Sequence, residues 1–101
     1  MRFIVQISIS VTKFNEVARG GNVGRKLAAI LEDIKPEAAY FTSKDGNRGG
    51  YLIVDLPNAS DIPRIAEPWF LTFDAKVEFL PVMSPGDLQQ AGLDALIKKW
   101  G

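Results

Sequence analysis

Hydrophobic residues change their spacing several times along this chain, and the order of the changes leaves few topologies open. Residues 2–10 alternate between an apolar side and a mixed side, which is typical of a strand with one covered face. Residues 22–34 carry an apolar stripe at helical spacing, which the Lys-Pro pair that follows brings to an end. Residues 38–43 and 49–56 then flank Asp45-Gly46, a pair that favours a tight hairpin between two strands.

The second half of the chain repeats the order of helix and strand. A short helix is expected after the turn at residues 57–60 and should end at Pro68, and residues 75–81 alternate as a fourth strand. Residues 84–100 predict an extra C-terminal helix, in which Gly92 is a candidate break. We therefore expect one α+β domain over residues 1–101, a ferredoxin-like βαββαβ unit whose four-stranded antiparallel sheet has its helices on one face.

The sheet face turned away from the helices should mix apolar and polar side chains. On the expected strand phases it carries Ile4, Gln6, Ser8, Tyr51, Ile53, Asp55, Lys76, Glu78 and Leu80. Such a face is too apolar to be left to water and too polar for a dry core, so a second sheet stacked on it would bury its apolar members. The sequence thus predicts a homodimer or a higher homo-oligomer with a cavity between the sheets.

The chain contains neither histidine nor cysteine, which limits the chemistry that it can perform. Histidine is the usual general base and zinc ligand at neutral pH, and cysteine supplies thiolate nucleophiles, disulfides and soft metal ligands. We expect no metal site and no cofactor. The twelve basic residues balance the twelve acidic ones, so no nucleic-acid or membrane partner is expected, and with no targeting segment visible the expected location is cytoplasmic.

Candidate site residues are the polar and aromatic side chains that the strands could direct into the cavity. Asp55 and Glu78 are the candidate catalytic carboxylates, because a desolvated carboxylate has a raised pKa and can act as a base; the alternative is that each pairs with Lys76 or an arginine. The candidate ligand-binding residues are Gln6, Ser8, Tyr40, Arg48, Tyr51, Trp69 and Lys76. For Arg48 the alternative is a solvated charge, and for Trp69 it is a place in the core.

Four segments together resemble a family of short bacterial proteins of unknown function, over essentially the whole chain. They are residues 35–42 (KPEAAYFT), 45–50 (DGNRGG), 66–70 (AEPWF) and 81–88 (PVMSPGDL). The family is similar to the dimeric α+β barrels, the superfamily of muconolactone isomerase, and the resemblance implies that fold and a dimer. Some members carry the label "pantothenate synthetase", but enzymes with that activity rely on paired histidines, so no catalytic residue is carried over to this chain.

Three functions therefore remain open at this point. The first is a small dimeric barrel that binds or transforms a small carboxylic or aromatic acid without a cofactor. The second is a non-enzymatic oligomeric interaction module whose C-terminal helix docks on a partner. The third, which follows from the family label alone, is an ATP-dependent ligase.

Overall fold

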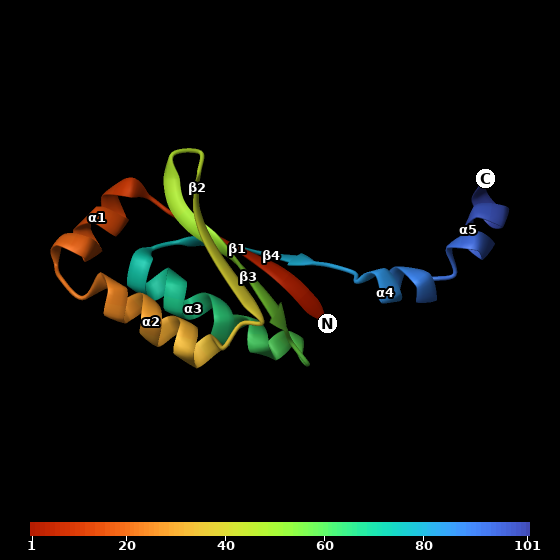
Figure 1. Cartoon of the computed structure of the whole chain (residues 1–101), viewed down its shortest axis with the longest axis horizontal. Helices are drawn as coiled ribbons and strands as arrows, with labels where there is room; N and C mark the ends of the chain where they lie inside the picture. Colours follow the sequence, from red (N-terminus) through yellow and green to blue (C-terminus); the bar gives the residue numbers. More distant parts are fainter.

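A computed structural model describes all 101 residues as an α+β fold with a C-terminal extension (Figure 1). The chain runs through β1 (Arg2–Ile9), α1 (Val11–Arg19), α2 (Val23–Ile34), β2 (Ala38–Lys44), β3 (Asn47–Asp55), η1 (Ala59–Asp61), α3 (Ile62–Phe73), β4 (Lys76–Pro81), α4 (Pro85–Gln90) and α5 (Leu93–Trp100). None of these helices is both long enough and apolar enough to cross a lipid bilayer.

The four strands form one antiparallel sheet in the order β2-β3-β1-β4, with the first and third strands in the centre. The β2–β3 hairpin turns at Asp45 and Gly46, both of which have positive φ, as a two-residue turn of this kind requires. The topology is ferredoxin-like only approximately, because two helices rather than one connect β1 to β2, and two more follow β4.

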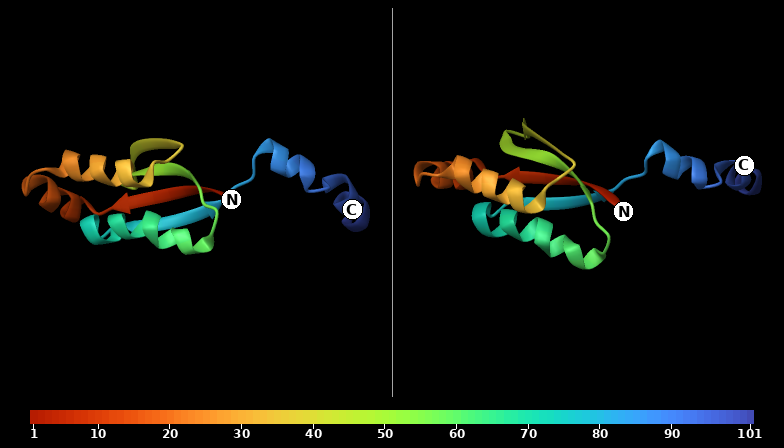
Figure 2. Two further views of the ribbon diagram at one scale, coloured as in Figure 1. Left: turned by 90° about the horizontal axis from the view of Figure 1, so that it is seen from below. Right: turned by 60° about the horizontal axis from the view of Figure 1, so that its bottom comes forward.

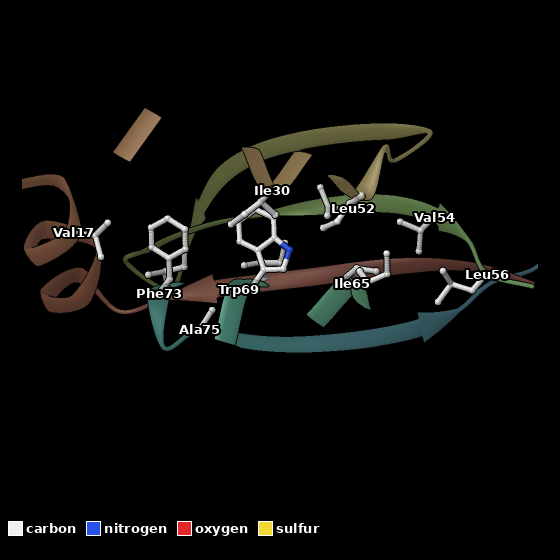
Figure 3. Packing of buried hydrophobic residues seen from close by; sticks show 13 residues of the cluster. Val17, Ile30, Leu52, Val54, Leu56, Ile65, Trp69, Phe73 and Ala75 are labelled. Carbon is white, nitrogen blue, oxygen red and sulfur yellow. The ribbon is translucent and has the colours of Figure 1, made fainter. Parts of the chain in front are cut away.

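The helices α1, α2 and α3 pack on one face of the sheet and bury its apolar side chains (Figures 1 and 2). The core joins alternate residues of β1 and β3 to the facing side chains of α2 and α3 (Figure 3). Trp69 and Phe73 of α3 are fully buried at its centre. The indole Nε1 of Trp69 is the one buried side-chain polar atom without a hydrogen-bond partner.

The helix expected after the turn at residues 57–60 does not end at Pro68 as predicted, because α3 continues to Phe73. A proline inside a helix removes one backbone hydrogen bond and costs about 3 kcal/mol or more. Here Ile65, Trp69 and Phe73 lie on one side of α3 at i, i+4 and i+8, and all three are buried. Burying such side chains contributes about 1.5–3 kcal/mol each, which offsets the cost of the proline.

The C-terminal helix expected over residues 84–100 is divided at its candidate break, Gly92, so the structure has two short helices there. Gly92 has φ of 71°, which breaks the helix and changes its direction. The two helices form an arm that projects from the body, and no residue of either helix is buried (Figure 1). The radius of gyration is 17.0 Å, compared with about 13 Å for a compact chain of 100 residues.

Gly49 is required by the close approach of β3 to β1. A Cβ atom at this position would lie 2.0 Å from the carbonyl oxygen of Ile7, so any side chain forces the two central strands apart. We expect Gly49→Ala to lower the free energy of unfolding by about 2 kcal/mol or more, measured by urea denaturation.

The matched control is Gly24→Ala, because a Cβ on Gly24 in α2 meets nothing within 4 Å. This change should leave stability unaltered or raise it by up to about 1 kcal/mol, since alanine favours a helix more than glycine does. Equal effects at the two positions would contradict the register of β3 on β1.

Candidate functional site

No helix covers the second face of the sheet, and its side chains are sorted along the strands. The cross-strand register places one apolar row of residues side by side: Ala38, Ile53, Ile4 and Leu80. The next row along the strands consists of Tyr40, Tyr51, Gln6 and Glu78, and the row after that of Thr42, Gly49, Ser8 and Lys76. The face therefore changes from apolar to polar toward the β2–β3 hairpin, and its membership is as predicted.

A hollow of about 410 Å³ lies at the polar end of this face, and we call it the sheet hollow. Five of the predicted site residues line it: Gln6, Ser8, Tyr51, Lys76 and Glu78. The hairpin contributes Lys44, Asp45 and Asn47 to its border. The alternation of β1, β3 and β4 brings the five side chains together, because residues two apart on a strand point to the same side.

The charges in the sheet hollow have no partners within the chain. The ion pairs of the structure include neither Lys76 nor Glu78, so the expected alternative for Glu78, a pair with Lys76, is not formed. Lys76 therefore offers an ammonium group for an anion, and the hydroxyl of Ser8 and the amide of Gln6 lie on the neighbouring strand. A carboxylate that binds here would gain a charge-assisted hydrogen bond from the lysine.

Asp55 lies outside the sheet hollow, at the opposite end of β3. Its carboxylate accepts a hydrogen bond of 2.9 Å from the amino-terminal ammonium group of Met1. This hydrogen bond and the charge of the ammonium group lower the pKa of Asp55 below its ordinary value. A general base near neutral pH needs the opposite shift, so Glu78 is the one predicted catalytic residue that the structure places in the hollow.

Arg48 and Trp69 do not meet the other predicted residues, because they lie on the helix side of the sheet. They border a second hollow of about 200 Å³, which we call the helix-side hollow, together with Ile7, Ile9, Phe14, Leu27, Phe41, Thr42 and Gly49. Trp69 is fully buried, as the core alternative expected. Tyr40 lies on the uncovered face opposite Tyr51 and is 67% exposed, but it borders neither hollow.

The sequence reasoning missed the contribution of the hairpin tip. Lys44, Asp45 and Asn47 belong to the segment between the two expected strands, which predicts a turn and no binding role, yet all three border the sheet hollow. A signal for Lys44 was present, because it continues the alternation of Tyr40 and Thr42 on β2. The chain contains no group of three or more acidic side chains placed to hold a metal ion.

Comparison with known proteins adds no function to this geometry, since no protein-family model and no curated protein matches the chain.

The ion pair at Asp55 gives a pH prediction. In protein that begins at Met1, a carbon-detected NMR titration should place the pKa of Asp55 below that of an ordinary aspartate. Because the folded-state pKa is lowered, the pair stabilises the fold above the unfolded-state pKa, and this contribution is lost as the pH falls through the folded-state value. Acetylation of the amino terminus is the control, and it should return the pKa toward normal. A raised pKa would instead support the role of Asp55 as a base.

Proposed function

We propose that the chain is a homodimeric binding domain for a small, polar carboxylic acid, in which two ferredoxin-like subunits stack their uncovered sheet faces and enclose the sheet hollow. The observation that carries this proposal is the sorting of the uncovered face, with an apolar row beside a hollow that contains an unpaired lysine. The resemblance to the dimeric α+β barrels favours the same architecture.

The apolar row supports the stacking of two sheets. Ile4 and Ile53 of the central strands are only half-buried, and Leu80 is 45% exposed, although all three are apolar. A contiguous apolar surface of this kind usually marks an interface. Two such faces related by a two-fold axis present the same row to each other, so one surface is complementary to itself.

The ligand proposal follows from what stacking does to the sheet hollow. A second sheet at the usual spacing of about 10 Å would exclude much of the water from the space in front of Lys76. Electrostatic attraction between the lysine and a carboxylate strengthens as water is removed. Tyr51 would flank the bound acid, and any proton transfer to or from it would rest on Glu78.

A second candidate function, an interaction module, is favoured by the arm. Helix α5 carries an apolar stripe formed by Leu93, Leu96, Ile97 and Trp100, and these residues are between 46% and 78% exposed. An amphipathic helix whose apolar stripe contains no buried residue is typical of a segment that docks on another surface. In this function the arm, and not the sheet, would hold the assembly together.

One measurement distinguishes these two modes of association. Multi-angle light scattering at high micromolar concentration should give twice the monomer mass of 11.1 kDa for the wild type. Ile53→Asp should give a monomer, because it buries an unpaired charge in the stacked face. Leu71→Asp is the matched control, since Leu71 is 79% exposed on α3, and it should remain dimeric. If Ile53→Asp remains dimeric but Leu96→Asp is monomeric, the arm and not the sheet holds the dimer together. A monomeric wild type would contradict both modes of association.

The acid-binding proposal is tested by thermal unfolding with millimolar lactate or succinate. A ligand at ten times its Kd adds about 1.4 kcal/mol to stability, which raises Tm by about 6 °C or more in a domain of this size. Lys76→Ala should remove the shift, whereas Lys26→Ala, an exposed lysine on α2, should keep it. The proposal fails if neither acid stabilises the wild type, or if both variants respond as the wild type does.

A further inference from the structure

The helix-side hollow is an apolar recess built by almost every element of the body. Its walls come from Ile7 and Ile9 of β1, Phe14 of α1, Leu27 of α2, Phe41 of β2 and Trp69 of α3. It lies on the other side of the sheet from the sheet hollow, and the two are separated at Gly49, which has no side chain and borders both. All of its walls belong to a single subunit, so the recess does not depend on a dimer.

The guanidinium group of Arg48 lies at the border of this apolar recess. The guanidinium carbon of Arg48 lies 4.4 Å from the ring centroid of Phe14, and Nη1 donates a hydrogen bond of 2.9 Å to Oδ1 of Asn15. These two contacts hold the guanidinium in place, yet no carboxylate of the chain pairs with it. A fixed guanidinium has N–H groups left for a second acceptor, and its planar fork suits a carboxylate.

The size of the helix-side hollow limits what could bind there. Its volume is about 200 Å³. In another protein, an apolar cavity of about 150 Å³ is large enough to bind benzene. The hollow therefore has room for one aromatic ring with a small substituent. The walls suit a ring chemically as well, because they are aromatic and aliphatic, and Phe14 is held by its stacking on Phe73, with centroids 5.7 Å apart.

We infer that the helix-side hollow binds a small aromatic monocarboxylate of the size of benzoate, with its ring against Phe14, Leu27 and Phe41, above the buried Trp69, and its carboxylate paired with Arg48. An apolar recess with one fixed polar group is the usual form of a small-molecule site, in which the apolar walls give affinity and the polar group sets orientation. A neutral aromatic compound would contact the apolar walls but leave the guanidinium group of Arg48 without an anion. A carboxylic acid without a ring would pair with the guanidinium group but make no contact with the apolar walls, so each should bind more weakly than an aromatic acid.

This site differs from the sheet hollow in its cation and in its ligand, although Ile7, Thr42 and Gly49 border both hollows. The sheet hollow offers Lys76 among polar side chains and suits a small polar acid, whereas Arg48 stands beside apolar walls. Substitutions of the two cations therefore test the two proposals independently. The failure of one does not remove the other.

The test is a fluorescence titration that uses Trp69 as the reporter. Trp100 is 78% exposed on the arm, so Trp100→Phe leaves the body intact and makes Trp69 the only tryptophan. In this background millimolar benzoate should change the emission with a saturable curve. Benzamide, which has the same shape but no charge, should bind about tenfold more weakly or worse, because it lacks the charge-assisted bond to Arg48.

Two variants in the same background complete the design. Arg48→Leu should weaken benzoate about tenfold or more and bring it close to benzamide, whereas Lys98→Leu, which removes an exposed lysine of the arm, should leave the benzoate curve unchanged. Leu27→Phe fills the recess with a larger side chain but keeps Arg48, so it should abolish the change of Trp69 emission on addition of benzoate. Phenylalanine is preferred to tryptophan here because it adds no second fluorescent reporter. The far-ultraviolet circular dichroism of each variant verifies its fold. The inference is overturned if benzoate gives no saturable change, if benzamide binds equally well, or if folded Arg48→Leu or Leu27→Phe binds benzoate as the parent does.

Discussion

The packing of α3 against the central strands determines how the rest of the molecule is arranged. Trp69 and Phe73 lie fully buried over β1 and β3, and together they anchor the helix layer to one face of the sheet (Figure 3). Large aromatic side chains contribute more buried area than any others, so this contact supplies much of the stability of a small domain. With the helices held on one side, the opposite face remains uncovered, and the candidate site lies on that face.

Much of this arrangement could be predicted from the sequence because it depends on local rules. Alternation in β1, β3 and β4 assigned the side chains of the uncovered face, and Asp45-Gly46 predicted the hairpin that sets the register of β2. The rules failed where a contact distant in sequence decides the outcome. Helix α3 continues past Pro68 because Trp69 and Phe73, which follow the proline, pack in the core. Arg48 lies on the helix side of β3, where its guanidinium group packs on the ring of Phe14 in α1.

The site residues divide in the same way. The five that line the sheet hollow share one strand phase, so a periodicity of two was sufficient to find them. Asp55 points to the same side of the sheet but lies at the far end of β3, where it pairs with the amino-terminal ammonium group. Alternation predicts the side of the sheet to which a residue points, but not which residues lie near it along the strand. Arg48 and Trp69 border the same hollow because of the way in which three helices cover the sheet. The periodicity within a single helix or strand contains no information about that packing.

The sheet thus separates two recesses of different chemistry, a polar one on the open face and an apolar one beneath the helices, which approach each other at Gly49. We propose that a second copy of the chain covers the open face. The most direct measurement is an isotope-filtered NOE experiment on a mixture of labelled and unlabelled chains. Cross-peaks between subunits should connect the methyl groups of Ile4, Ile53 and Leu80. Their absence in a sample of dimeric mass, or cross-peaks that instead connect the arm or the helix layer, would show that the open faces do not stack.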